Sequence, residues 1–385
     1  MKAHLTVPSA VFFTLVFAAL ATGNPLLYLL AVLTLLTVAL CFAGVMWASA
    51  TLQIGAETDQ ETVHRGDTAD LLLQIRHRGW IPIAPVTLEL NTPAGGGTRT
   101  IRLRNMPGRT QKIRIPLHAA HVGCFSAGVR SCTLEDLPGI FRRRIVPSET
   151  TYSLTVLPLT FATDPLAMAP GDPGSDIMAR ATEDLNSPSD TRAYQPGDAM
   201  KKIHWKLSLR KGELMVRKFD EPVLQETLIL MDCSVPEADN PETEADLRDA
   251  LLETAASLFT DQVKTEHTVR MPLGGKHPIN LDDRMGLPIV FDYLTRAEFS
   301  ASARFEQVLM MESRRLGKTG CIAVITSRLS GQAVEMMARM HRMGPNLRLY
   351  LVTLNPDDPA MLPLIARLQH AQIEVAYVTP GGAGE

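Results

Sequence analysis

The longest uncharged stretch of this chain lies near its N-terminus, where no Asp, Glu, Lys or Arg occurs between Lys2 and Glu57. One membrane crossing needs roughly 20 apolar residues, so this stretch is too long for one transmembrane helix and about right for two. The turn-forming residues 23–25, Gly-Asn-Pro, divide it. The sequence therefore predicts a helical hairpin with transmembrane helices at about 7–22 and 26–50.

A cleaved signal peptide is the alternative, because Ala-Leu-Ala at 19–21 resembles a cleavage site. A second apolar span follows almost at once and Lys2 is a thin positive region, which favours the uncleaved hairpin. The loop at 23–25 carries no charge, whereas the N-terminus carries Lys2 and the α-amino group. The positive-inside rule then places the soluble domains in the cytoplasm. Cleavage would leave the second helix in the same orientation.

Composition bears on partners and on redox chemistry. The net charge of -3 is near neutral, so bulk charge does not predict a nucleic-acid-binding protein. The five cysteines are scattered and odd in number, which does not suit a disulfide framework. If the soluble domains instead faced an oxidising compartment, Cys124 and Cys132 would be expected to oxidise across a local hairpin.

Residues 51–160 show the alternation of short β-strands. Ile101 and Leu103 alternate with arginines, and a second alternating run follows at 113–117. Turn-rich sequences separate these runs, which predicts an all-β sandwich domain. Residues 161–190 are rich in Pro, Gly, Asp and Ser without periodicity and are predicted to be a linker that wraps over a neighbouring surface.

The pattern changes to alternating strands and helices after Glu226. The apolar run 227–231 predicts a buried strand that ends at Asp232, and 244–262 has the spacing of a helix. Further strands and helices alternate as far as residue 378, which predicts a mostly parallel sheet with helices on both faces. The tail, 380–385, is predicted to be disordered.

Residues 192–217 combine a turn, a short basic helix and a strand. Pro and Gly precede Asp198, which is a good N-cap residue, and Gly212 is placed to end the helix in a left-handed conformation. Apolar residues at helical spacing give the helix one apolar face: Met200, Ile203 and Leu207. The alternation that follows predicts a strand.

This segment resembles the core of the bacterial "domain of unknown function 58" family. The family pattern runs R-x-Y-x-P-G-D, then I-x-W, then S-x-R, then L-M-V-R, and residues 192–217 contain these elements in that order and spacing. The resemblance is specific here and extends over most of the soluble part. It implies a multi-domain chain with a transmembrane hairpin, an all-β sandwich and a C-terminal α/β von Willebrand factor A-like, Rossmann-like domain. The core motif and this α/β domain together occupy 191–379.

Two roles are predicted within the motif. Tyr194, Ile203 and Trp205 are expected to anchor the local fold. The charged and titratable residues are the interaction candidates: Arg192, Asp198, Lys202, His204 and Arg210. The basic patch to which they belong suits anionic lipid, a protein partner or nucleic acid. A helix with a single aromatic residue is a weak indication of nucleic-acid binding.

Asp232 and Ser234 follow the first strand of the α/β region and match the start of the D-x-S-x-S metal-site motif of von Willebrand factor A domains. Such a site holds Mg²⁺ through hard oxygen ligands at strand ends. Here Pro236 replaces the second serine, and Arg328 stands after the later strand, where an acidic ligand is expected. The sequence therefore predicts a degenerate site that binds no metal. It also predicts that the chain uses no cofactor and that Asp232 caps a turn.

Members of the resembled family are commonly encoded beside MoxR-type AAA+ ATPases and transglutaminase-like membrane proteins. The resemblance thus implies a membrane-anchored, non-enzymatic interaction or assembly component that is a partner or substrate of such an ATPase, with a transglutaminase-like membrane protein as a further partner. Two alternatives remain open: a metal-dependent hydrolase at the strand ends near Asp232, and nucleic-acid binding through the basic helix. The missing ligands weigh against the first and the near-neutral charge against the second.

Overall fold

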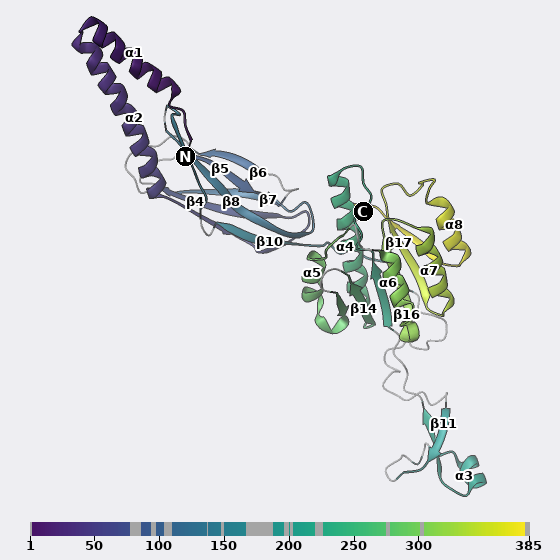
Figure 1. Ribbon diagram of the computed structural model, residues 1–385. Coiled ribbons are helices and arrows are strands. Elements are labelled where there is room, and N and C mark those ends of the chain that lie inside the picture. The colour runs from purple at the N-terminus through teal and green to yellow at the C-terminus, as the bar shows by residue number, and fades with distance from the viewer. Residues whose placement is uncertain are drawn as a thin grey trace. The chain divides into compact units, whose positions relative to one another are not determined.

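The computed structural model divides into two compact units, Met1–Leu159 and Thr160–Glu385, and each is described by itself (Figure 1). The residues that the structure describes are 2–77, 86–93, 98–103, 110–136, 138–147, 150–166, 188–195, 200, 203–219, 226–274, 278–300 and 304–381.

Two apolar helices, α1 (Thr6–Thr22) and α2 (Pro25–Thr51), open the first unit. Gly23 ends α1 in the left-handed conformation, with φ of 63°. The Asn24 side chain then caps α2 by accepting from the Leu26 backbone N–H at 3.0 Å, and Pro25 occupies the first turn, where its missing N–H costs nothing. The predicted division at 23–25 is confirmed.

The second of these helices, α2, is long and apolar enough to cross a membrane, whereas α1 is a shorter apolar helix of 17 residues. Outward-facing leucines and phenylalanines cover both helices. Such a surface is unfavourable in water and suits lipid. Length and composition show one N-terminal helix that could cross a membrane, while anchoring, the two-span hairpin and the cytoplasmic side remain predictions.

Two β-sheets form the rest of the first unit. A seven-stranded sheet contains β1 (Lys2–Ala3), β3 (Thr62–His64), β5 (Val86–Asn91), β6 (Thr98–Leu103), β8 (Gly123–Glu135), β9 (Phe141–Ile145) and β10 (Thr151–Leu157). A three-stranded sheet contains β2 (Leu52–Thr58), β4 (Thr68–His77) and β7 (Thr110–His118), in the order β2-β4-β7.

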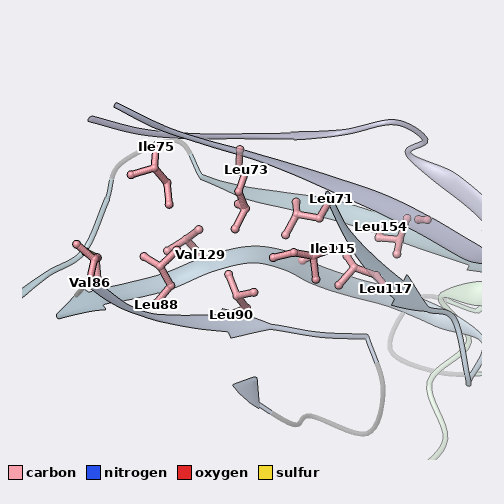
Figure 2. Close-up of a cluster of buried hydrophobic side chains, with 14 of the residues drawn as sticks. Leu71, Leu73, Ile75, Val86, Leu88, Leu90, Ile115, Leu117, Val129 and Leu154 are labelled. Carbon is pink, nitrogen blue, oxygen red and sulfur yellow. The ribbon is translucent and has the colours of Figure 1, made fainter. Parts of the chain in front are cut away.

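The two sheets enclose one apolar core, as Figure 2 shows. Leu71, Leu73 and Ile75 point inward from β4, and β5 contributes inward residues from the other sheet in the same alternating pattern. Alternation of buried and exposed positions along a strand is what a two-layer β arrangement requires. The predicted all-β region is therefore present, as two facing sheets.

The predicted local hairpin between Cys124 and Cys132 is wrong, because both cysteines lie on the single strand β8. Eight residues of extended chain separate them by about 26 Å, far beyond the reach of a disulfide. Cys124 is exposed and Cys132 is buried. Burial raises the pKa of Cys132 to about 12, so this thiol is also poorly reactive.

The second unit contains a six-stranded sheet in the order β15-β14-β13-β16-β17-β18. Its strands are β13 (Glu226–Met231), β14 (Thr268–Leu273), β15 (Ile279–Asp282), β16 (Thr319–Thr326), β17 (Asn346–Val352) and β18 (Glu374–Val378). Neighbouring strands are parallel except for β15, which pairs antiparallel with β14 at one edge. The predicted mostly parallel sheet is thus confirmed as a mixed α/β region.

Helices cover this sheet on both faces (Figure 1). The helices are α4 (Pro241–Lys264), α5 (Leu287–Thr295), α6 (Phe305–Glu312), α7 (Gly331–Arg342) and α8 (Leu362–His370). Side chains of α6, α7 and α8 share one apolar cluster with β13, β16 and β17. The long helix α4 contacts β13, β14, β16 and β17 and is buried along much of its length.

The beginning of the predicted linker lies against the α/β region. Thr163 donates from its backbone N and from Oγ1 to Asp261 Oδ2, at 3.0 and 2.7 Å. Arg348 donates to Asp164 at 3.1 Å. Residues 167–187 of the predicted linker lie outside the described residues. So do residues 382–385 of the predicted disordered tail.

A small module of β11 (Pro188–Ala193), α3 (Trp205–Lys211) and β12 (Met215–Phe219) carries the sequence motif. The two strands are antiparallel, with Arg192 opposite Val216. As predicted, Gly212 ends the helix in the left-handed conformation, with φ of 76°. The helix α3 begins at Trp205 with His204 as its N-cap, and the predicted N-cap Asp198 lies outside the described residues.

Candidate functional site

The carboxyl ends of β13 and β16 form the position in this sheet where a ligand site is expected. The chain proceeds from β13 to β14 on one side, while β16 lies on the other side of β13. In open α/β sheets, the crevice at such a reversal of strand order is the usual location of a binding site. Asp232 follows β13 directly, Thr326 ends β16, and the Asp232 backbone N–H donates to the Ile325 carbonyl at 2.8 Å.

Asp232 is buried, and its carboxylate is engaged by neighbouring donors. Oδ1 accepts from the Ser234 backbone N–H at 2.9 Å and also from the Ser234 hydroxyl. Oδ2 accepts from the Thr326 hydroxyl at 2.8 Å. The predicted turn-capping role of Asp232 is confirmed, and the same carboxylate joins β13 to β16.

Arg328 supplies the positive charge at this site. Its Nε lies 3.9 Å from Asp232 Oδ2, and its Nη1 lies 3.8 Å from Glu237. The loop that carries it is fixed because the Arg328 backbone N–H donates to the Thr326 hydroxyl at 3.2 Å. A guanidinium is a permanent cation, so it offsets the buried carboxylate without a metal ion.

The donor set fits a divalent metal poorly. Asp232 and Glu237 are the carboxylates that Arg328 contacts at these strand ends, so a cation already lies beside both of them. Pro236 has no hydroxyl to offer, whereas Mg²⁺ requires several hard oxygen ligands in near-octahedral array. The geometry does not favour Mg²⁺ at Asp232 and Ser234.

Cys233, between these two residues, is a poor nucleophile. Burial, and then the neighbouring Asp232 carboxylate, raise the pKa of this thiol to about 11. The thiolate is the reactive form, so little of it exists near neutral pH. The Ser234 hydroxyl is buried and donates to a carboxylate rather than to a histidine base.

Ser330 connects the loop after β16 to two helices. Its hydroxyl accepts from the Ala333 backbone N–H at 3.0 Å and thereby caps α7, and it donates to Glu306 Oε1 at 2.6 Å. This hydrogen bond, then the Glu306 backbone amide, and finally Arg328 and Arg304 hold the pKa of the Glu306 carboxyl below its usual value. Loop, α6 and α7 therefore share one polar junction.

Replacing Ser330 by Ala is expected to lower the free energy of unfolding by about 1 kcal/mol through loss of the cap. The Glu306 pKa is depressed in the fold, so its contribution is complete above the unfolded-state pKa and is lost as pH falls through the folded-state pKa. Urea denaturation at a series of pH values from neutral to acidic measures the free energy of unfolding. We expect this free energy to fall less with acidification in Ser330→Ala than in wild type. Equal slopes for the two proteins would contradict the assignment.

The structure describes the five interaction candidates of the motif to different extents. His204 is structural, since its Nδ1 accepts from the Leu207 backbone N–H at 3.2 Å. Arg210 is exposed on α3. Arg192 lies in β11, and only its backbone pairing is described, while Asp198 and Lys202 lie outside the described residues. His204 and Arg210 are the two candidates whose side chains the structure describes, and a shared site of all five remains a prediction.

The predicted anchoring residues also have different outcomes. Ile203 is buried and bridges to Val216, as predicted. Ser208 adds a second local link, because the Met215 backbone N–H donates to its hydroxyl at 2.8 Å. The prediction that Trp205 is a core anchor is wrong, since its side chain is 57% exposed. The predicted helix face of Met200, Ile203 and Leu207 is also not formed by α3, because Met200 and Ile203 lie before its first residue, Trp205.

Sequence reasoning missed two residues near the end of β16, Glu306 and Ser330, which hydrogen-bond to each other. Ser330 carries a signal of its own, because serine before a run of helical periodicity is a preferred N-cap. Glu306 shows only the acidic residue common in the first turn of a helix. The two residues are 24 positions apart in the chain, so only the folded structure brings them into contact.

Comparison with known proteins places the motif and the first part of the α/β region in a family. Residues 190–278 match the family described as "Protein of unknown function DUF58", which confirms over this segment the resemblance predicted from 192–217. None of the curated proteins compared with the chain matches it.

Solved structures give only distant likenesses. The CARDB domain of a Pyrococcus furiosus protein, in complex with di-metal ions, has 11% identity and a TM-score of 0.20, over 27% of this chain and 91% of that one. Spo0M, a sporulation control protein from Bacillus subtilis, has 11% identity and a TM-score of 0.17, over 28% and 49%. Cwp6 from Clostridium difficile has 8% identity and a TM-score of 0.19, over 86% and 53%.

Proposed function

We propose that this chain is a membrane-anchored, non-enzymatic interaction or assembly component of the bacterial inner membrane. In this proposal α1 and α2 both cross the membrane, and the α/β region is a von Willebrand factor A-like domain in the cytoplasm. Its partner is a MoxR-type AAA+ ATPase, which binds the domain or acts on it as a substrate. A transglutaminase-like membrane protein is a further candidate partner.

The observation that carries the proposal is that the carboxylate at the strand ends already has partners within the protein. The Asp232 carboxylate, which a metal-dependent hydrolase would use, is already occupied by Ser234, Thr326 and Arg328. A rigid, internally satisfied strand end is better suited to presenting a surface than to activating water. The assignment of an interaction role to this fold is itself an analogy between folds.

The sheet architecture and charge distribution support an interaction surface at the carboxyl ends of the strands. Four neighbouring strand pairs are parallel, one edge strand is antiparallel, and helices cover both faces, as the resemblance implies for a von Willebrand factor A-like domain. Arg328 is partly exposed and Glu237 is almost fully exposed beside it. A protein partner with complementary charges would find both signs within one small area.

The test is capture of the purified ATPase by the full chain reconstituted in lipid vesicles, with ATP, with ADP and without nucleotide. We expect nucleotide-dependent binding that Glu237→Arg weakens about tenfold, since a charge at an interface is reversed. Glu266→Arg is the matched control, because Glu266 is exposed between α4 and β14, at the amino ends of the parallel strands rather than at their carboxyl ends. Equal binding by both variants would move the interface away from the strand ends.

The enzymatic alternative makes a different prediction about metal. Titration of the full chain with Mg²⁺ or Mn²⁺ should give no saturable binding at millimolar concentration, because the Asp232 oxygens and the adjacent cation leave too few ligands. Calorimetry measures this directly. A one-site isotherm that Asp232→Ala abolishes, with nucleotide-independent capture of the ATPase, would replace the interaction role by a hydrolase.

A further inference from the structure

The small module of β11, α3 and β12 has an exposed apolar ridge on α3. Trp205 and Leu209 lie four residues apart and therefore on one face of the helix, and their side chains are 57% and 85% exposed. Met200 is also exposed, just before the helix. Large apolar side chains grouped on the surface of a small module are unfavourable in water and mark a contact surface.

Cations border this ridge. Lys206 and Arg210 lie four residues apart on the adjacent face of α3, and Lys211 follows, all of them exposed. No acidic residue occurs within α3. The helix thus presents apolar and positive side chains together, which is the composition of segments that lie at the boundary between lipid headgroups and acyl chains. Tryptophan is favoured at that boundary because its ring is amphipathic.

We propose that α3 is a membrane-docking element whose occupant is the anionic surface of the bilayer that holds the N-terminal helix. Trp205 and Leu209 enter the interfacial layer, and Lys206, Arg210 and Lys211 bind lipid phosphates. The inference uses the membrane anchor but does not depend on the ATPase. Charge complementarity selects the bilayer, because one anionic leaflet satisfies both the apolar ridge and its flanking cations.

The anchor explains why so short a helix suffices. Each cation near an anionic bilayer strengthens binding by about fivefold, so three cations and two apolar side chains give weak binding for a free protein. Because α2 is long and apolar enough to cross a membrane, the chain itself would tether α3 to that membrane. A tethered second contact has a high effective concentration and forms even when its intrinsic affinity is low.

The experiment uses the full chain in vesicles of phosphatidylcholine or of an equal mixture with phosphatidylglycerol, both containing brominated acyl chains that quench tryptophan. Subtracting the signal of Trp205→Phe isolates Trp205 from the other tryptophans, Trp47 and Trp80. We expect strong quenching of Trp205 in the anionic vesicles, little in the neutral ones, and a decrease with added salt.

Charge reversal tests the cations. Lys206→Glu with Arg210→Glu should weaken docking at least about 25-fold, from two cations at about fivefold each. The matched control is Arg339→Glu with Arg342→Glu on α7, where both arginines are exposed and the change in net charge is the same. Leu209→Gln should also reduce quenching while its melting temperature stays near that of wild type, since this side chain contributes little to the core.

Several results would overturn the proposal. Quenching that is equal in neutral and anionic vesicles and insensitive to salt would remove the role of the cations. Equal loss with the α7 control would show a general effect of net charge. If Trp205 is unquenched by lipid but becomes shielded from a water-soluble quencher when the ATPase or a second copy of the chain is added, the ridge is a protein interface.

Discussion

Asp232→Ala is expected to lower the free energy of unfolding of the α/β region by about 2–4 kcal/mol. The Ser234 amide and hydroxyl would lose their buried acceptor, and each unsatisfied buried donor costs about 1–3 kcal/mol before relaxation. The Thr326 hydroxyl would keep an acceptor, because it also lies 2.8 Å from the Arg328 carbonyl. Arg328, partly exposed, would lose its partner but keep access to water. Thermal and urea denaturation of the two proteins measure the difference.

Asp358→Ala is the matched control for this effect. Asp358 Oδ1 makes the same type of turn by accepting from the Ala360 backbone N–H at 3.0 Å, but at the protein surface. Water can replace this acceptor, so the expected cost is about 0.5–1 kcal/mol. The comparison therefore separates burial from the turn itself.

The same measurement with Mg²⁺ decides what Asp232 does. A metal bound only to the folded state stabilises it by RT ln(1 + c/Kd), where c is the free metal concentration, so the melting temperature rises once c exceeds Kd. We expect wild type and Asp232→Ala to show no shift with millimolar Mg²⁺. Stabilisation of wild type alone would identify Asp232 as a ligand and contradict the structural role.

The sequence was informative where local chemistry alone determines the structure. Gly23 and Asn24 end one helix and cap the next, and Gly212 ends α3, because left-handed backbone and capping depend on a few adjacent atoms. Alternation of strands and helices likewise predicted the sheet of the second unit. The position of Asp232 at a strand end could be predicted for the same reason.

The sequence could not show which part of the fold, if any, packs against each apolar or polar surface. The spacing of Met200, Ile203 and Leu207 predicted one apolar helix face, but Met200 and Ile203 lie before α3, which begins at Trp205. Ile203 is buried and bridges to Val216 of β12, while Trp205 is exposed. Periodicity identifies which residues share a face and does not identify what covers it. The same limit applies to Glu306, whose contact with Ser330 joins separate elements.

The strand β8 shows a second kind of ambiguity. Gly128 lies between Cys124 and Cys132, and glycine within an apolar segment marks either a turn or a close approach of two chains. Here it allows a close approach, because Val129 donates to the Thr150 carbonyl at 3.1 Å. The pairing of β5 with β8 also shifts register nearby, as at a β-bulge.

Gly128→Ala is expected to destabilise the β region by about 3 kcal/mol or more. The added Cβ would lie 2.0 Å from the Thr150 carbonyl oxygen, and φ at this position is 140°, which other residues rarely adopt. Backbone strain of this kind costs about 1–3 kcal/mol, and forced separation of closely packed strands adds about 1–3 kcal/mol. Urea denaturation followed by circular dichroism measures the loss.

Two controls separate strain from contact. Gly139→Ala places a Cβ at φ of 74° with nothing within 4 Å, so it isolates the cost of the backbone conformation. Gly55→Ala adds a methyl group within β2, where the nearest atom lies at 3.8 Å and φ is ordinary. If Gly128→Ala were no more destabilising than Gly139→Ala, the approach of Thr150 would carry no energetic weight. A larger loss, with a circular dichroism signal that remains β-rich before unfolding, would show that the two strands meet only because position 128 has no side chain.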